Sequence, residues 1–279
     1  MIRRLTQLKD KGVEVLETIK FELHEGVGTL TLNRPTRKNA IDAVMREELK
    51  ALVPTLPQMR DLRALILTGA GGSFCAGGDI SVMGAGTLAP EEGRHRMRHD
   101  YLSWIETLLR LEVPVISAIE GPAFGAGFSL ALTADIVLSA PSGRFCMSFM
   151  RLGLVPDCAA FYTLPRIVGT QRAKELAFSA RELSAEQARD LGIVLEIVPE
   201  GRVLERAQQM AKCFALAAPA ALAMTKRALN VSMNSSLDAM MDIEADAQAV
   251  ARTSDWHTDA VQRFLNKKPS AFQWPGSLD

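Results

Sequence analysis

Two glycine-rich turns constrain the fold of this chain more than any other feature of its sequence. The first, Gly69–Asp79, follows the apolar run Leu62–Thr68, and the second, Gly121–Gly127, follows the strand-like segment that begins at Pro114. A buried strand, a tight turn and a helix form the repeating unit of α/β proteins. Because this pattern occurs twice, we predict an α/β core with largely parallel strands, in which each turn ends a strand and begins a helix.

The remaining segments fit the same architecture. Residues 18–24 and 27–32 alternate apolar and polar side chains around a Glu25-Gly26 turn, which predicts a hairpin. Asp42 is placed to cap a helix over about 43–53. Further elements are expected as a helix over about 91–111, a strand over 135–139, and mostly helical structure from 156 to 268.

The end of the chain has a different pattern. Segments 220–231, 236–253 and 257–266 are typical of amphipathic helices whose apolar faces need a partner surface. Ala217-Ala218-Pro219 marks a break before them. We therefore divide the chain into an N-terminal arm (1–14), a core (15–216) and a helical C-terminal region (217–279).

Composition excludes several classes of protein. Lys+Arg and Asp+Glu each number 32, and this zero net charge argues against a nucleic-acid-binding protein. No apolar stretch is long enough to cross a bilayer. The four cysteines, at positions 75, 146, 158 and 213, form no C-x-x-C pair, which argues against a zinc ribbon or a disulfide framework. With no apolar signal segment at the N-terminus, we expect a cytoplasmic protein.

The paired turns have a possible chemical use. The first N–H groups of a helix have no helical acceptor, and small residues let a ligand oxygen approach them. Two such turns on neighbouring strands could direct two N–H groups at one oxygen and form an oxyanion hole. The alternative is that the glycines only make tight turns. A dinucleotide site is disfavoured, because Phe74 and Leu130 replace the third glycine of G-x-G-x-x-G.

Two other candidate sites are weak. Ser129 lies in a near match to G-x-S-x-G, but it falls inside the helix after the turn, where a small residue packs helix on sheet. His95 and His99 have the spacing of two metal ligands. Arginines at 94, 96 and 98 surround them, so a solvated basic face is favoured and no metal site is predicted.

Asp157 is the most informative carboxylate. It stands at the start of an expected helix beginning at 158, where an N-cap role is the simplest interpretation. Its neighbours are apolar, so desolvation would raise its pKa while the helix N-terminus would lower it. A carboxylate in such a balance can act as a base, and position alone leaves both roles open.

Seven segments together resemble the crotonase family, the enoyl-CoA hydratase/isomerase superfamily. They are residues 33–40, 73–80, 119–127, 133–136, 151–157, 164–169 and 264–269. Their order and spacing agree from about residue 15 to 270. The resemblance implies a crotonase-like spiral of repeated ββα units that binds acyl-CoA thioesters. It also implies that the C-terminal region builds a homotrimer, or a hexamer made as a dimer of trimers.

The resemblance also assigns roles to residues. The backbone N–H groups of Gly78 and Ala126 match the family's oxyanion hole, and Asp157 matches the acid–base position of several isomerases. Substrate or CoA contacts are implied at Arg37, Lys38, Ala40, Ala76, Asp79, Ile80, Ser129, Phe149, Phe264 and Lys267, the last two in the pocket of the same chain or of a neighbour. No metal, flavin or nicotinamide is implied, since coenzyme A arrives as part of the substrate.

Two departures from the family decide the expected reaction. Hydratases carry Glu at the positions of Ser129 and Phe149, so the usual activation of water by two carboxylates is absent here. We therefore expect double-bond isomerisation of an enoyl-CoA, as in fatty acid metabolism, with Asp157 as acid and base. The alternatives are an enoyl-CoA hydratase, which is a lyase, and a non-catalytic acyl-CoA-binding protein.

Overall fold

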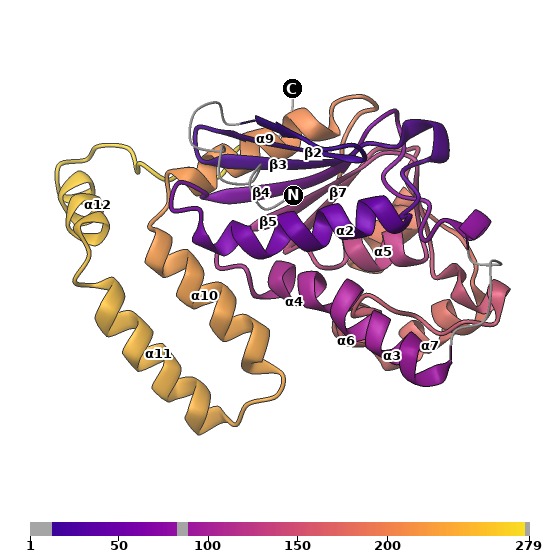
Figure 1. Cartoon of the computed structure of the whole chain (residues 1–279). Helices are drawn as coiled ribbons and strands as arrows, with labels where there is room; N and C mark the ends of the chain where they lie inside the picture. Colours follow the sequence, from indigo (N-terminus) through magenta and orange to yellow (C-terminus); the bar gives the residue numbers. More distant parts are fainter. Residues whose placement is uncertain (1–12, 83–88, 277–279) are drawn as a thin grey trace.

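The computed structural model describes residues 13–82 and 89–276 of the chain, and its centre is a seven-stranded sheet (Figure 1). The strand order is β1-β2-β3-β4-β5-β7-β10. β1 to β3 pair antiparallel, and β3 to β10 pair parallel. The strands are β1 (Val13–Val15), β2 (Ile19–His24), β3 (Val27–Leu32), β4 (Ala64–Gly69), β5 (Val115–Ile119), β7 (Ile136–Ser139) and β10 (Glu196–Ile197).

A second, three-stranded sheet supports the glycine turns. Its order is β6 (Pro122–Phe124), β8 (Arg144–Cys146) and β9 (Leu183–Ser184). β6 is itself part of the second turn, and an isolated bridge between Cys75 and Ala123 joins the first turn to it. The two turns are therefore held side by side by backbone hydrogen bonds.

Helices cover both faces of the large sheet (Figure 1). Leu65 and Leu67 of β4 belong to the core shared with α2 (Ala43–Leu52), α4 (Ser103–Arg110) and α5 (Ala126–Ala131). Ile66, between them, belongs to the core under α9 (Val203–Ala215). Because side chains alternate along a strand, a strand buried on both faces must be apolar throughout, which explains the continuous run in β4.

The core contains several further helices and turns. They are α3 (Pro90–Arg96), a π-helix (Met97–Leu102), α6 (Ala160–Val168), α7 (Thr170–Ser179), α8 (Ala185–Asp190), and 3₁₀ turns at Pro35–Arg37, Val53–Gln58, Ile80–Val82 and Ser148–Leu152. No helix within residues 13–82 and 89–276 combines the length and the apolar character needed to cross a membrane.

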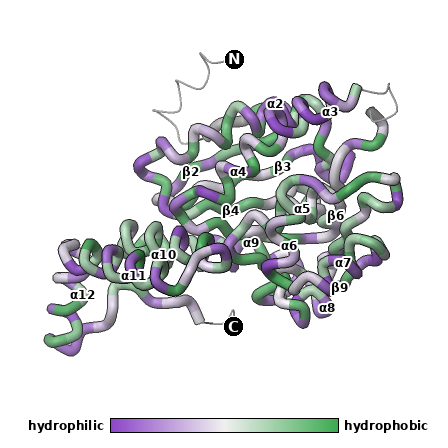
Figure 2. The backbone as a smooth tube through the Cα atoms, turned by 90° about the horizontal axis from the view of Figure 1, so that it is seen from below, coloured by the Kyte–Doolittle hydropathy of each residue, from purple (hydrophilic) through white to green (hydrophobic). Residues whose placement is uncertain are grey.

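Three C-terminal helices, α10 (Pro219–Ser232), α11 (Leu237–Ala251) and α12 (Asp255–Leu265), extend away from this core (Figures 1 and 2). Lys226 of α10 anchors them through an ion pair with Asp135, 2.6 Å from nitrogen to oxygen. None of the three has a buried residue, and apolar side chains such as Leu237 (74% exposed) remain uncovered.

The parallel core, the hairpin and the three C-terminal helices confirm the sequence predictions. One local prediction was wrong. The first glycine turn leads into a 3₁₀ turn rather than an α-helix, because the Asp79 carboxylate accepts the Ser81 N–H and closes a short turn there. The helix expected over 91–111 is confirmed as continuous helical structure from Pro90 to Arg110, with a π-helix at its centre.

The predicted N-terminal arm, 1–14, is largely outside the described residues. Its last two residues, Val13 and Glu14, belong to β1, which pairs with β2. The core therefore begins inside the segment assigned to the arm.

Candidate active site

A cavity of about 600 Å³ lies where the two glycine turns meet the π-helix and the segment that precedes α6. Gly78 and Ala126 line it from the two turns, and Tyr101 lines it from the π-helix. Phe149 and Asp157 are also in its lining. The two predicted oxyanion donors and the predicted acid–base residue therefore line one cavity.

The Gly78 N–H is directed by a short parallel bridge. Ile41 N–H donates to the Gly77 carbonyl (2.7 Å), and Asp79 N–H donates to the Ile41 carbonyl (2.9 Å). In a parallel bridge, the residue between these two bonds turns its own N–H to the opposite side. Among the hydrogen bonds of the described residues, the Gly78 N–H has no acceptor, and Gly78 lines the cavity.

Ala126 is the first residue of α5, so its N–H has no acceptor within the helix. No other acceptor for it exists within the described part of the chain. The two turns approach closely: a Cβ added at Gly77 would lie 3.6 Å from the Ala126 nitrogen and only 2.8 Å from the Phe124 oxygen. Glycine at 77 therefore permits an approach at which both free amides can face one oxygen atom.

Asp157 presents a carboxylate to the same cavity. Its Oδ1 atom is buried and has no hydrogen-bond partner among the described residues. Burial raises the pKa of Asp157, and the adjacent Cys158 side chain offsets part of the rise. Within the lining of the cavity, Asp157 is the only acidic residue that the structure describes. Such a carboxyl group accepts a proton more readily than an exposed one.

The N-cap role considered for Asp157 is wrong. α6 begins at Ala160 rather than at 158, and the Asp157 carboxylate makes no capping hydrogen bond; the Ala160 N–H donates to the Asp157 backbone carbonyl instead. The intervening Cys158 and Ala159 have left-handed backbones, with φ of +50° and +65°. Such conformations are unfavourable for residues with a Cβ and are found preferentially at functional sites.

The two positions at which hydratases carry Glu differ in their surroundings. Phe149 is buried and lines the cavity. Ser129 is completely buried on α5, and its hydroxyl donates to the Gly125 carbonyl (3.3 Å). Ser129 is absent from the cavity lining, so the structure does not place it among substrate contacts. Its buried position favours the alternative given in the sequence analysis, a small residue that packs the helix on the sheet.

Five of the predicted CoA contacts fall into two groups, those that line the cavity and those that do not. Ala76 and Ile80 line the cavity, with Ile80 62% exposed at its rim. Arg37 and Lys38 are exposed, and Lys38 accepts the Ala76 N–H through its backbone carbonyl (2.9 Å). Ala40 is buried.

Three other predicted contacts are not brought to this cavity. Asp79 is buried, and its carboxylate is bound to Arg34 and Ser81. Phe264, in α12, and Lys267, just after it, are at the far end of the C-terminal helices from α5 (Figures 1 and 2). Within one chain, Phe264 and Lys267 therefore do not approach the cavity.

His95 and His99 are both exposed. Their rings lie 4.3 Å apart, but the described residues contain no cluster of His, Cys, Asp and Glu able to hold a metal ion. The arginines at 94, 96 and 98 are exposed as well, as expected for a solvated basic face.

Sequence reasoning missed two features of the site. One is the wall that Arg96 and Tyr101 contribute from α3 and the π-helix, for which the charged sequence of this segment gave no signal. The other is Arg34, whose guanidinium binds Asp42 and Asp79. In the sequence, Arg34 stands between a predicted strand and Pro35, where an exposed turn is equally compatible with a basic residue. Its two carboxylate partners therefore could not be inferred.

Comparisons with known proteins agree with this geometry. The family described as Enoyl-CoA hydratase/isomerase matches residues 22–275. The chain belongs to the enoyl-CoA hydratase/isomerase family. Its fold is that of the crotonases. The solved enoyl-CoA hydratase/isomerase from Cupriavidus metallidurans CH34 superimposes with a TM-score of 0.89 at 43% identity, covering 95% of this chain and all of that one.

Relatives within the family have different names. The 1,2-epoxyphenylacetyl-CoA isomerase of Escherichia coli K12 is 38% identical over 260 residues, 92% of this chain and 99% of that protein. The short-chain-enoyl-CoA hydratase of Clostridium acetobutylicum is 30% identical over 256 residues, 91% of this chain and 96% of that protein. Family membership therefore supports acyl-CoA chemistry and leaves the reaction to the residues of the site.

Proposed function

We propose that the protein moves the double bond of an enoyl-CoA thioester, with Asp157 as acid and base and the Gly78 and Ala126 N–H groups as an oxyanion hole. The observation that carries the proposal is Asp157 itself. It is the one acidic residue described in the lining of the cavity, it has a raised pKa and an unpartnered oxygen, and it shares the cavity with both free amides.

The reaction follows from these three groups. The two N–H groups stabilise negative charge on the thioester oxygen, which acidifies the carbon next to the carbonyl. Asp157 removes a proton from that carbon, and the electron pair moves to the oxygen as the enolate forms. The protonated Asp157 then returns the proton two carbons further along, and the double bond becomes conjugated with the carbonyl. One carboxyl group suffices because no water is added or lost.

Hydration of a 2-enoyl-CoA is the alternative within the family. It requires a group that holds and activates water, and neither Ser129 nor Phe149 supplies one. The apolar wall around Phe149 also disfavours an ordered water at that position. These features favour isomerisation over hydration. A protein that binds acyl-CoA without turnover remains the other alternative.

A ring-bearing acyl group is a second candidate substrate. The Escherichia coli relative is named for an aromatic-derived thioester, 1,2-epoxyphenylacetyl-CoA. The cavity of about 600 Å³ has Tyr101 and Phe149 in its lining, and these rings can stack on a planar substituent. Aryl and aliphatic thioesters therefore both belong in the assay.

The proposed mechanism needs no metal or redox cofactor, since two amides and one carboxyl group supply every step. We also propose that the uncovered apolar faces of α10 to α12 build a homotrimer, alone or paired as a hexamer. In that assembly Phe264 and Lys267 would reach the CoA end of a neighbouring cavity, which their own chain does not allow.

The decisive assay compares turnover of 3-enoyl and 2-enoyl thioesters of several acyl types. The proposal predicts that isomerisation of 3-enoyl-CoA exceeds hydration of 2-enoyl-CoA, and that Asp157→Asn lowers kcat by roughly 10²–10⁴. Faster hydration than isomerisation would favour the hydratase. No conversion of any thioester, with CoA-ester binding retained, would favour the binding protein.

A further inference from the structure

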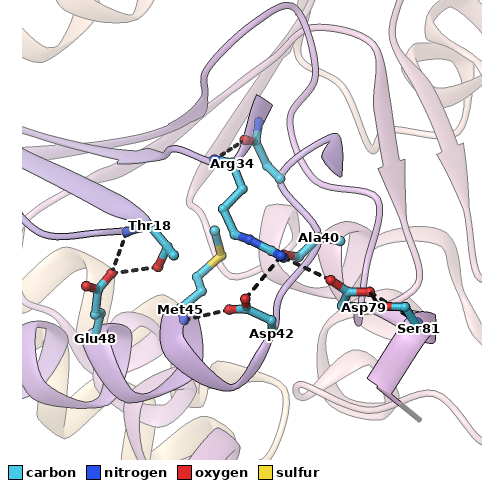
Figure 3. Close-up of polar contacts among 9 residues, drawn as sticks. Thr18, Arg34, Ala40, Asp42, Met45, Glu48, Asp79 and Ser81 are labelled. Carbon is cyan, nitrogen blue, oxygen red and sulfur yellow. Dashed lines mark hydrogen bonds and ion pairs between the residues drawn. The ribbon is translucent and has the colours of Figure 1, made fainter. Parts of the chain in front are cut away.

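Arg34 makes an unusual set of contacts close to the Gly78 half of the site (Figure 3). Its side chain is only 17% exposed. Nη1 donates to the Ala40 carbonyl (2.5 Å) and to Asp79 Oδ2 (3.1 Å), and Nη2 lies 3.1 Å from Asp42 Oδ2. One planar guanidinium therefore joins two separate segments of the chain.

These partners flank the bridge that directs the Gly78 N–H. Ala40 and Asp42 are the two neighbours of Ile41, and Asp79 directly follows Gly78. Arg34 thus holds both strands of the Ile41–Gly78 bridge at once. The two backbone bonds of the bridge set the direction of the Gly78 N–H, and Arg34 connects the two segments that make those bonds.

Both carboxylates are also fixed from their other side. Asp42 Oδ1 accepts the Met45 N–H at the start of α2 (2.9 Å), and Asp79 Oδ1 accepts the Ser81 N–H and hydroxyl. Figure 3 shows Arg34 between these two anchors. Hydrogen bonds from Ser81 and Arg34 hold the pKa of Asp79 below its usual range, so the pair stays charged at neutral pH. This arrangement leaves Arg34 little freedom to move.

We propose that Arg34 is a positioning residue for the oxyanion hole: it holds the Ile41–Gly78 bridge in register so that the Gly78 N–H faces the thioester oxygen. The inference rests on the proposed function, which supplies the oxygen. Direction matters because a hydrogen bond weakens steeply as its angle departs from linearity. Arg34 itself is absent from the cavity lining, so its effect would be exerted through the backbone of the bridge.

The test uses Arg34→Lys, which keeps one positive charge but loses the planar fork that serves three acceptors. The matched control is Arg206→Lys. Arg206, in α9, is also buried (side chain 4% exposed), binds Glu196, Gln209 and the Gly276 carbonyl, and is absent from the cavity lining. Both variants lose hydrogen bonds of a buried arginine, so only an effect at the site distinguishes them.

The readout is the infrared C=O stretch of bound butyryl-CoA labelled with ¹³C at its carbonyl, which shifts to lower frequency when N–H groups polarise the oxygen. We expect the shift in the parent and in Arg206→Lys, and a smaller shift in Arg34→Lys. We also expect kcat of Arg34→Lys to fall roughly 10- to 10²-fold, less than the 10²–10³ for complete loss of one donor, with KM nearly unchanged.

The outcomes separate the inference from the proposed function. A parent protein that binds the thioester without any carbonyl shift would overturn the oxyanion hole itself. A normal shift in Arg34→Lys would overturn the role of Arg34 and leave the oxyanion hole intact. Should Arg34→Lys fail to fold, Asp79→Asn replaces it, because Asn keeps an oxygen for Ser81 but removes the charged partner of Arg34. A normal shift in folded Asp79→Asn would equally overturn the role of Arg34.

Discussion

Replacing Asp157 by Asn should stabilise the protein at neutral pH while it inactivates the enzyme. Burial raises the pKa of Asp157 in the folded state above the value of about 3.9 for an unfolded chain. The folded protein therefore keeps its proton over a pH range in which the unfolded chain has lost it. As pH rises through that range, ionisation lowers the free energy of unfolding by about 1.4 kcal/mol for each unit of pKa difference.

Asparagine has nearly the same size as aspartate and cannot ionise, so Asp157→Asn should remove the loss of stability that ionisation of Asp157 causes. Because the Asp157 carboxylate makes no capping bond, the substitution breaks no helix cap. A gain of 1 kcal/mol corresponds to roughly 2–4 °C in Tm for a chain of this size. The gain should be present above the folded pKa of Asp157 and should disappear below about pH 3, where both states of the parent are protonated.

The assay is thermal melting of the parent and Asp157→Asn from acid to neutral pH, with kcat measured on the same samples. Asp61→Asn, at the exposed turn before β4, is the matched control and should change neither quantity. A lower Tm for Asp157→Asn at neutral pH would contradict the structural reasoning, since it would mean that the carboxylate stabilises the fold. Full turnover in Asp157→Asn would contradict its role as base.

Three further predictions concern the second donor, the end of the acyl pocket and assembly. Ala126→Pro deletes one N–H group at the start of a helix, where proline is tolerated. It should lower kcat by roughly 10²–10³ in steady-state assays, and an unchanged kcat would exclude Ala126 as a donor. A second cavity of about 670 Å³ shares Leu102, Ala159 and Tyr162 with the lining of the site. Leu102→Ala should join the two cavities more widely and shift kcat/KM toward longer acyl chains. An unchanged preference across a chain-length series would show that Leu102 does not limit the length of the acyl chain. Sedimentation should show trimers or hexamers, whereas a stable monomer at micromolar concentration would refute the assembly proposed from the exposed faces of α10 to α12.

The parallel core and the position of the turns could be predicted from sequence because strong local signals mark them. The small residues are needed for packing: a Cβ at Gly127 would lie 2.3 Å from the Cys75 oxygen, so only glycine lets α5 rest on the first turn. The glycines of the sequence motif are thus the residues that the packing of α5 requires, which is why the motif predicted the position of the turn.

The details of the site depend on contacts that no local pattern encodes. Arg34 and Asp79 are 45 positions apart in sequence. The ion pair between them, which keeps the Asp79 carboxylate from other partners, could therefore not be inferred from the residues around Asp79. The left-handed backbones of Cys158 and Ala159 delay the start of α6, although neither residue type favours that conformation. Tertiary structure imposes both features, and both determine which groups face the substrate.

The most direct test of the proposed chemistry is exchange of the proton next to the thioester carbonyl. A saturated acyl-CoA cannot isomerise, but the parent protein in D₂O should exchange this proton for deuterium, detected by NMR or mass spectrometry. The proposal predicts rapid exchange in the parent, and loss of roughly 10²-fold or more in both Asp157→Asn and Ala126→Pro. No exchange in the parent, or undiminished exchange in Asp157→Asn, would contradict an enolate formed in this oxyanion hole by Asp157.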